Sequence, residues 1–381
     1  MRSVILWHKI DCLTQAHLAD ICAEVGSRQG AESSVINKRL RHRYSRQTVF
    51  PGIGDEGQAK LGRSSVVIIG CGALGCNIAS LLVRAGVGRL RIIDRDFIEY
   101  HNLQRQVLFN ENDIEAQLPK AIAAQRHLKK VNSSVEIEGI VADVNSGNIE
   151  KLVSGTDIIL DGLDNFETRF LINDAALKHK IPWVYGGAIA SKGMTMNIVP
   201  GETACLRCIA PILPSQETTA TCETVGIVGT VPAVIGALEA TEAMKILIGS
   251  AKVSRELVIV DVWERSFDLI DIKPRSDCPA CHGRYETLEK TSGVKMTSLC
   301  GQTRAIQVVD SSVSSIAFEQ LAAQLKKLGD VSYNKFVLRF GIAGYEIIVF
   351  PDGRAIIKNT IDESLAKELY SKYVADLSHR T

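Results

Sequence analysis

The chain has 381 residues, a formal net charge of +1 at pH 7 and an apolar content of 46%. This length allows one large domain or two ordinary ones. With so small a net charge and no basic stripe interleaved with aromatic residues, a nucleic-acid partner is not expected.

The apolar runs are too short for export or membrane insertion. At the N-terminus only Val4–Trp7 precedes His8 and Lys9, which is shorter than a signal-peptide core. The longest uncharged apolar stretch, Val225–Leu238, contains Pro232 and falls short of the roughly 20 residues that span a bilayer. The sequence therefore predicts a cytoplasmic protein with no membrane partner, whose cysteines act as ligands, nucleophiles or packing residues rather than in disulfides.

In chain order, residues 1–40 carry only a weak helical pattern and are interpreted as an N-terminal extension. Strand and helix patterns then alternate, which predicts a doubly wound, Rossmann-like, mostly parallel α/β sheet. The expected elements are strands at Val66–Gly70, Leu90–Asp94, Val135–Val141, Ile158–Asp161, Pro182–Gly186 and Met194–Val199, and helices at Leu74–Arg84, Ala121–Val131, Thr168–Lys178 and Val231–Leu247.

A polar linker at Thr287–Ser292 precedes a change of pattern. Residues 295–381 predict a small α+β domain, to which the sequence assigns no role. Its expected elements are a strand at Thr303–Val309, a helix at Ser314–Leu328, strands at Phe336–Phe340, Tyr345–Phe350 and Arg354–Lys358, and a final helix that begins near Thr360.

A glycine-rich turn follows the first predicted strand. The segment VVIIGCGALG places Gly70, Gly72 and Gly75 in a G-x-G-x-x-G pattern between a strand and a helix. Such glycines allow a phosphate to approach the backbone at a helix N-terminus, and Asp94 ends the next strand where a ribose hydroxyl needs an acceptor. The pattern predicts a nucleotide site, and alone it fits a NAD-dependent dehydrogenase as well as an ATP enzyme. Similar turns also occur without any ligand.

Candidate phosphate-binding side chains lie around this turn in the sequence. Asn102 and Arg105 stand three residues apart in HNLQRQ, Lys120 opens the next helix, and Arg46 stands in RYSRQ. Three cations suit a triphosphate better than the diphosphate of a hydride-transfer cofactor. Each cation taken alone is also compatible with a solvated surface charge.

Asp164 lies in the segment DGLDN, at the end of another predicted strand. An aspartate at this sheet edge would suit Mg²⁺ on the phosphates of a nucleotide. Asp164 or Asn165 could instead cap the following helix, which requires no metal. The spacing leaves both interpretations open.

Two CxxC pairs, Cys205 with Cys208 and Cys278 with Cys281, offer four thiolates. This spacing predicts a closed tetrahedral zinc site of structural type that joins two distant segments. One alternative is two unrelated buried turns. Another is haem attachment, because Cys278–His282 spells CxxCH, but that chemistry requires an export signal.

Cys222 lies apart from these pairs, in a threonine-rich stretch. Free cysteines are commonly packing residues, whereas a flexible polar segment favours an accessible nucleophile. Cys300 receives no assignment.

Together, these motifs resemble the ubiquitin-activating-type adenylyltransferases, the ThiF, MoeB and HesA family. The likeness covers residues 41–285 and is greatest to bacterial enzymes that act on sulfur-carrier proteins in molybdopterin and thiamine biosynthesis. The motifs that carry it are RYSRQ, GCGALG, Asp94, NLQRQ, Lys120, LDN, CLRC, TCET and CPAC.

The resemblance implies a role for each motif. ATP would lie on Gly70, Gly72 and Gly75 with its ribose on Asp94, and the four cysteines of the CxxC pairs would hold a structural zinc. The phosphates of ATP would contact Asn102, Arg105 and Lys120, and Asp164 would bind the catalytic Mg²⁺. Arg46 would reach into the site of a partner subunit, which implies a homodimer. Cys222 matches a cysteine that forms a covalent link in some relatives and is dispensable in others.

The implied reaction is adenylation of the C-terminal Gly-Gly carboxylate of a ubiquitin-like sulfur-carrier protein, which prepares that carrier for thiocarboxylate formation. Residues 295–381 show no rhodanese-like loop, so a separate sulfur donor, a cysteine desulfurase or a rhodanese, is expected. The chain departs from the family pattern in residues 1–40 and at Glu115–Lys120, where the family has Gly-x-Pro-Lys. The alternatives are a NAD-dependent dehydrogenase, a non-catalytic zinc scaffold for a ubiquitin-like partner, and a relative that acts on a tRNA base.

Overall fold

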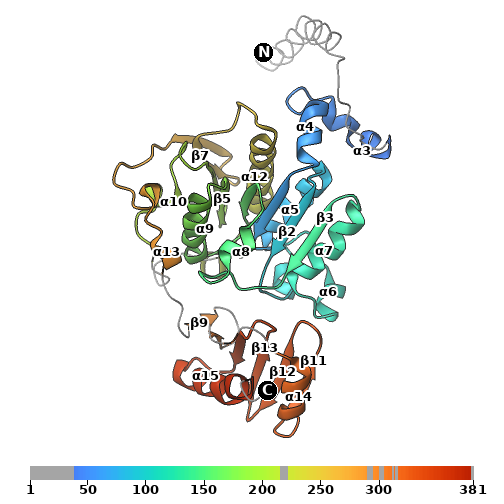
Figure 1. Ribbon diagram of the computed structural model, residues 1–381, viewed down its shortest axis with the longest axis vertical. Coiled ribbons are helices and arrows are strands. Elements are labelled where there is room, and N and C mark those ends of the chain that lie inside the picture. The colour runs from blue at the N-terminus through green and yellow to red at the C-terminus, as the bar shows by residue number, and fades with distance from the viewer. Residues whose placement is uncertain are drawn as a thin grey trace, which may run out of the picture. The chain divides into compact units, whose positions relative to one another are not determined.

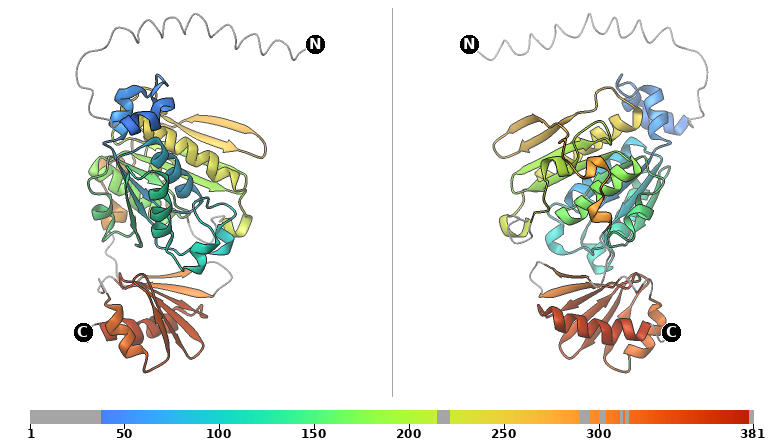
Figure 2. Two further views of the ribbon diagram at one scale, coloured as in Figure 1. Left: turned by 90° about the vertical axis from the view of Figure 1, so that its right-hand side faces the viewer. Right: turned by 60° about the vertical axis from the view of Figure 1, so that its left-hand side comes forward.

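The computed structural model describes residues 38–214, 222–289, 295–299, 304–310, 313 and 316–378 (Figures 1 and 2). The chain divides into two compact units, residues 1–46 and 47–381. Helix α3 (Lys38–Thr48) contains the described part of the first unit. The helical pattern predicted within residues 1–37, and Cys300, lie outside the described residues.

The larger unit contains an eight-stranded sheet with the strand order β3-β2-β1-β4-β5-β6-β7-β8. The pairings from β3 to β5 are parallel, and those from β5 to β8 are antiparallel. The strands are β1 (Ser65–Ile69), β2 (Arg89–Ile93), β3 (Glu136–Ile140), β4 (Ile158–Asp161), β5 (Trp183–Ile189), β6 (Lys192–Ile198), β7 (Glu256–Asp261) and β8 (Ser266–Asp271).

The predicted Rossmann-like parallel sheet is therefore confirmed, and the antiparallel half is new. Strands β5 and β6 pair across the two residues Ala190 and Ser191, and so short a connection permits only an antiparallel hairpin. Strands β7 and β8 were not predicted from the sequence. Every side chain of β8 is exposed, so this strand lacks the buried apolar run that marks the central strands.

Helices cover both faces of this sheet (Figure 1). The helices of this part of the chain are α4 (Gly54–Leu61), α5 (Ala73–Ala85), α6 (Glu111–Glu115), α7 (Lys120–Val131), α8 (Ile149–Val153), α9 (Phe166–His179), α10 (Leu206–Ile209), α11 (Cys222–Val225), α12 (Thr230–Ile248) and α13 (Glu286–Glu289), with 3-10 turns η1 (Tyr100–Asn102) and η2 (Ala280–His282).

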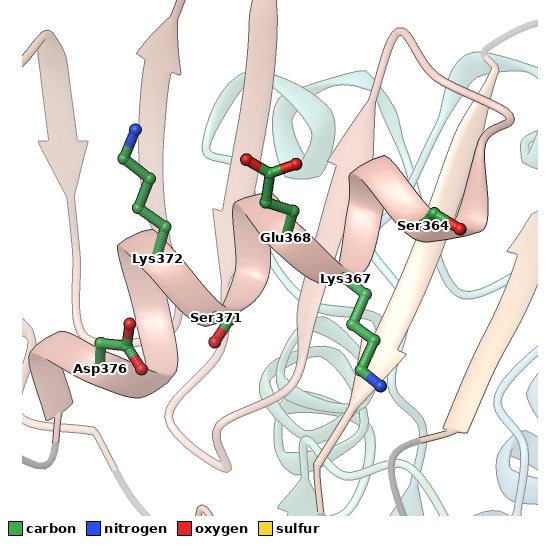
Figure 3. A pocket seen from close by; sticks show the side chains of 6 residues that line it. All are labelled: Ser364, Lys367, Glu368, Ser371, Lys372 and Asp376. Atoms are coloured by element: carbon green, nitrogen blue, oxygen red, sulfur yellow. The ribbon is translucent and has the colours of Figure 1, made fainter.

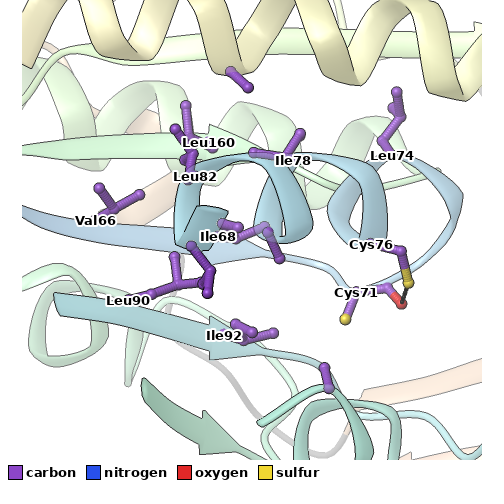
Figure 4. Close-up of a cluster of buried hydrophobic side chains, with 14 of the residues drawn as sticks. Val66, Ile68, Cys71, Leu74, Cys76, Ile78, Leu82, Leu90, Ile92 and Leu160 are labelled. Atoms are coloured by element: carbon purple, nitrogen blue, oxygen red, sulfur yellow. Dashed lines mark hydrogen bonds between the residues drawn. The ribbon is translucent and has the colours of Figure 1, made fainter. Parts of the chain in front are cut away.

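Alternate residues of β1 supply two separate cores. Val66 and Ile68 pack on the side of α5, α7 and α12, and Val67 and Ile69 pack on the side of α8 and α9. Figure 4 shows the first core, where Leu74, Ile78 and Leu82 of α5 lie among side chains of β1, β2 and β4. This alternation is what a strand buried on both faces requires, and it explains the continuous apolar run before the glycine turn.

Residues 295–378 include a six-stranded antiparallel sheet with the order β11-β12-β13-β14-β10-β9. Asp362 caps the last helix because its carboxylate accepts hydrogen bonds from the amides of Ser364 and Leu365. The elements are β9 (Lys295–Leu299), β10 (Ala305–Val309), α14 (Phe318–Leu325), β11 (Asp330–Tyr333), β12 (Leu338–Ile342), β13 (Tyr345–Val349), β14 (Ala355–Lys358), α15 (Glu363–Tyr370), the π-helical turn η3 (Ser371–Ala375) and α16 (Asp376–Ser378).

Helices α14 and α15 pack on this sheet around a core of its own, which includes Ile306, Val308, Leu321 and Tyr370. Strands β9 and β11 were not predicted, and the helix expected at Ser314–Leu328 begins only at Phe318. Among the described helices of the chain, none combines the length and apolar character needed to cross a bilayer.

Candidate functional site

The glycine turn lies between β1 and α5, at the carboxyl edge of the parallel strands. Gly70 has a φ of 93°, and a Cβ there would lie 2.5 Å from the carbonyl oxygen of Gly162. A Cβ on Gly75 would lie 2.1 Å from the carbonyl oxygen of Gly70. Packing of the protein against itself therefore requires glycine at both of these positions.

Gly72 is different because the protein leaves room beside it. A Cβ there would meet the Gly162 carbonyl oxygen at 3.6 Å, which is an ordinary contact. Gly72 also precedes α5, and no side chain caps that helix. The side-chain oxygen of Gln106 is buried near this turn without a hydrogen-bond partner in the described part of the chain. Open space beside uncapped helix amides is what a phosphate ligand requires.

Asp94 ties this turn to the loop that follows β2. Its carboxylate accepts hydrogen bonds from the amide of Cys71 at 2.6 Å and from the amide of Asp96 at 2.7 Å. Burial raises the pKa of Asp94, and Lys120 and the two amides oppose that rise. A carboxylate has about four lone-pair sites, so two remain for hydroxyl groups of a ligand.

Lys120 stands at the first position of α7 and is 7% exposed. Its Nζ lies 3.0 Å from an Asp96 carboxylate oxygen. Burial alone would lower the pKa of Lys120, but the charges of Asp96 and Asp94 outweigh it and raise that pKa. Partial burial opposes ionisation of Asp96, whose side chain is 53% exposed, but the charges of Lys120 and Arg95 outweigh it and lower the pKa of Asp96 to about 2. The ammonium group is thus fully charged beside Asp94.

The departure from the family pattern at Glu115–Lys120 is accommodated locally. Gln117 takes a left-handed conformation with a φ of 48°, and the amide of Leu118 bonds back to the carbonyl of Asp113. The segment forms a tight turn after α6, and Pro119 leads directly into α7.

The end of β4 and the loop after it contain the DGLDN segment, for which the sequence allowed either a helix cap or a magnesium ligand. Asn165 caps α9, because its side-chain oxygen accepts a hydrogen bond of 2.9 Å from the amide of Thr168. Asp164 does not cap the helix and is exposed. Its charge helps to raise the pKa of Lys120, so the two side chains lie within electrostatic reach of each other.

Asn102 and Arg105 make their described contacts within their own segment. The side-chain oxygen of Asn102 accepts from the amide of Glu99 at 3.0 Å, and an Arg105 guanidinium nitrogen donates to the carbonyl of His101 at 2.8 Å. Gln106, in the same segment, approaches the position beside Gly72. The segment therefore borders the turn.

For two further predicted site residues, Arg46 and Cys222, the structure describes no contact with the glycine turn. Arg46 belongs to the smaller unit, 1–46. Cys222 begins α11, and its side chain lies outside the described part of the structure.

A buried ion pair under the loop after β4 was missed by the sequence analysis. Asp161 and Arg169 lie 2.9 Å apart and are both buried, and Arg169 also donates to the carbonyls of Leu163 and Gly186 at 2.7 Å. Asp161 is the first aspartate of DGLDN, but its pairing with a helix residue eight positions later has no sequence signature. The pair fixes the backbone that carries Asp164.

The four cysteine sulfurs of the CxxC pairs meet on the opposite side of the sheet from α5. Four of their mutual distances are Cys205–Cys208 3.8 Å, Cys205–Cys278 3.6 Å, Cys208–Cys281 3.7 Å and Cys205–Cys281 3.5 Å. A tetrahedron with zinc–sulfur bonds of about 2.3 Å has sulfur separations of about 3.8 Å. The thiols therefore fit a tetrahedral metal ion.

Burial disfavours the thiolate form of two of these cysteines, Cys205 and Cys281. Burial, with repulsion from the neighbouring sulfurs, raises the pKa of Cys205, and burial raises the pKa of Cys281 to about 12. A divalent cation favours thiolates and would reverse this effect.

A shallow hollow lies along α15 and η3 in the last domain, remote from all predicted site residues in the sequence. Figure 3 shows side chains of both charges along one helix, and no two of them converge on a common point. The lining residues are Ser364, Lys367, Glu368, Ser371, Lys372 and Asp376. This alternation is typical of a solvated helix face.

Comparison with known proteins relates the part of the chain that forms the eight-stranded sheet to one protein family. Residues 44–280 match the model of the ThiF family. The sulfur carrier protein ThiS adenylyltransferase of Bacillus subtilis is 40% identical over 336 residues, which cover 87% of this chain and 99% of that protein. The SAMP-activating enzyme E1 of Haloferax volcanii is 34% identical over 68% of this chain and 95% of its own length.

The fold agrees with these sequence matches. The crystal structure of E. coli MccB with ATP is similar at a TM-score of 0.55 and 25% identity, over 63% of this chain and 74% of that one. The likeness to the B. subtilis protein extends beyond the residues of the family match, so part of it lies outside 44–280. By its family match and by its relatives, this chain belongs to the ThiF family.

Proposed function

We propose that this chain uses ATP to adenylate the C-terminal Gly-Gly carboxylate of a ubiquitin-like sulfur-carrier protein. The observation that carries the proposal is the open position at Gly72, bordered by Asp94 and Lys120, in a chain that is 40% identical to a sulfur-carrier adenylyltransferase. The carrier carboxylate attacks the α-phosphorus, the bond to the β-phosphate oxygen breaks, and pyrophosphate leaves.

Each predicted residue has a place in this reaction. Amides of the turn and the α5 N-terminus hold phosphate oxygens, and Asp94 accepts from the ribose. Asn102, Arg105 and Lys120 bind the phosphates, and Asp164 would hold Mg²⁺, which would neutralise charge on the leaving pyrophosphate. No protein nucleophile is needed, because the chemistry consists of alignment and charge neutralisation.

The zinc proposal rests on the sulfur geometry of Cys205, Cys208, Cys278 and Cys281. With four sulfur ligands the ion has no open position, so its role is structural. It joins the segment after β6 to the segment after β8. We further propose that residues 41–285 form the ATP-binding adenylation domain that contains the zinc site, between the extension 1–40 and the α+β domain 295–381.

The remaining assignments follow from the family. We propose a cytoplasmic homodimer in which Arg46 completes the site of the partner subunit, and a separate cysteine desulfurase or rhodanese as sulfur donor. Cys222 is proposed to attack the carrier acyl-adenylate after adenylation, so that a thioester to Cys222 forms, the acyl–phosphate bond breaks and AMP leaves.

The test is carrier-dependent exchange of pyrophosphate into ATP, with small Gly-Gly-ending proteins supplied one at a time. Exchange with one carrier that is lost in Asp164→Ala supports the proposal. The matched control is Glu202→Ala, which removes an exposed carboxylate paired with Arg255. Absence of exchange with every carrier by a folded, zinc-loaded chain would favour a non-catalytic scaffold, and tight nicotinamide binding without ATP turnover would favour a dehydrogenase.

A further inference from the structure

The C-terminal sheet is hydrogen-bonded to the loops that follow β2 and β3. Arg354 donates to the main-chain carbonyl of Arg95 at 3.0 Å and to the side-chain oxygen of Gln307 at 3.1 Å. Gln307 donates to Asp143 at 3.4 Å, and Asp143 accepts from the guanidinium of Arg95 at 2.7 Å. The four residues thus form a closed circuit, with two members from each domain.

This contact is buried and partly aromatic. Arg354 is 1% exposed, Gln307 is 2% exposed, and the Arg354 guanidinium lies 3.6 Å from the centre of the Phe350 ring. Phe350 in turn packs against Phe97 of the β2 loop, with ring centres 5.9 Å apart. Burial lowers the pKa of Arg354, and Asp352 and Asp143 oppose it. A guanidinium is buried at this cost only where its planar fork is held by several acceptors.

Arg354 donates to the main-chain carbonyl of Arg95, which lies between Asp94 and Asp96, and these two aspartates shape the candidate nucleotide site. Arg95 follows Asp94, whose carboxylate holds the glycine turn through the amide of Cys71. It precedes Asp96, which pairs with Lys120 through both its side chain and its carbonyl. A change in the backbone at Arg95 therefore shifts both Asp94, the proposed ribose acceptor, and Asp96, the partner of Lys120.

We propose that the C-terminal domain supports the ATP site from outside it, and that Arg354 is a positioning residue that fixes the loop carrying Asp94 and Asp96. The inference rests on the proposed function in that ATP is the ligand of this loop. Arg354 acts through the backbone of Arg95 and does not touch the nucleotide. The domain thus helps to hold the ATP-binding loop in place and does not supply a catalytic group.

The test uses the full chain and measures the dissociation constant of ATP and the rate of exchange at saturating ATP. We expect Arg354→Gln to raise the ATP dissociation constant about tenfold, while the saturated exchange rate changes less than about twofold. Arg354→Lys is expected to recover part of the loss, because one ammonium can serve the carbonyl of Arg95 but not both acceptors in fork geometry. The matched control is Arg339→Gln, which removes an arginine of the same domain that is paired with Glu346.

Hydrogen exchange supplies a readout independent of activity. In Arg354→Gln the amides of Cys71 and Asp96 should lose protection, while amides of β12 and β13 keep theirs and show that the domain remains folded. Gln307→Leu breaks the same circuit from its other side and preserves approximate volume. The effects of Arg354→Gln and Gln307→Leu should be less than additive, because both belong to one network.

Unchanged ATP affinity and unchanged loop protection in both folded variants would overturn the inference. Failure of the proposed function looks different, because the wild-type chain itself would then neither bind ATP nor exchange pyrophosphate. If Arg354→Gln does not fold, Gln307→Leu serves as the test. We expect it to show the same loss of ATP affinity and of hydrogen-exchange protection at the Asp96 amide. Equal losses in Arg339→Gln would assign the effect to general destabilisation and would also overturn the inference.

Discussion

Asp94 accepts main-chain hydrogen bonds from both Cys71 (2.6 Å) and Asp96 (2.7 Å), so one buried carboxylate joins the glycine turn to the loop after β2. These two bonds preorganise the turn before any ligand binds. A carboxylate that accepts two amides cannot be replaced by a side chain with one acceptor atom without loss.

We therefore expect Asp94→Asn to lower the free energy of unfolding by about 1–3 kcal/mol, because one buried amide loses its acceptor. ATP affinity should fall as well. Denaturant unfolding and ATP titration of the two proteins check this. A variant as stable as wild type would contradict the bridging role.

The glycines of the turn should separate into two classes. Gly75→Ala places a Cβ 2.1 Å from the Gly70 carbonyl oxygen and should cost about 1–3 kcal/mol or more of stability through overpacking. Gly72→Ala meets only ordinary contacts and should leave stability nearly unchanged, while ATP binding weakens. Thermal unfolding with and without ATP measures both, and a strongly destabilised Gly72→Ala would show that packing also requires this glycine.

Asp164 and Asn165 should also behave differently. Asn165→Ala removes the cap of α9 and should cost about 1 kcal/mol of unfolding free energy. Asp164→Asn should leave stability within about 0.5 kcal/mol. It should slow carrier-dependent exchange by about 100-fold or more, because it removes charge neutralisation at the leaving group. An active Asp164→Asn enzyme would remove the case for magnesium at this position.

The cysteine cluster should bind one zinc ion per chain. Because such an ion would join segments 73 residues apart, Cys278→Ser should abolish zinc binding and lower the unfolding free energy by at least about 3 kcal/mol. Elemental analysis and unfolding, with and without a chelator, measure this. Chelator should then have no further effect on Cys278→Ser, and an equal effect on both proteins would place the metal elsewhere.

Glu239 of α12 makes stability depend on pH. Both of its carboxylate oxygens are buried, and burial raises its pKa well above the usual value, with repulsion from Asp161 adding to the rise and Arg169 opposing it. The folded chain then binds a proton that the unfolded chain releases. The contribution is fully present below the unfolded pKa of about 4.3 and is lost as pH rises towards the folded pKa.

Glu239→Gln removes this titration. Its unfolding free energy relative to wild type should increase with pH above about 5, by up to about 1.4 kcal/mol per pH unit within the titration window. Unfolding curves of both proteins between pH 4 and 8 test this. Parallel pH dependence would show that Glu239 titrates normally.

The sequence by itself determined the local units. The apolar run before the glycines, the helix after them and the alternation that continues to α12 are short-range patterns, and the structure reproduces each within a few residues. The motifs also identify the family by themselves, because residue types at fixed spacing are local information. By contrast, β8 lacked such a pattern, since its exposed side chains do not form a core face.

Only the tertiary structure decided which distant groups meet. It assigned the helix cap to Asn165 rather than Asp164, and it placed the sulfurs of Cys205 and Cys278 3.6 Å apart. It also buried Arg354 against the carbonyl of Arg95, 259 residues away in the chain. Such contacts depend on how whole sheets pack, and packing sums many weak interactions between residues far apart in the chain. No short sequence pattern encodes that sum.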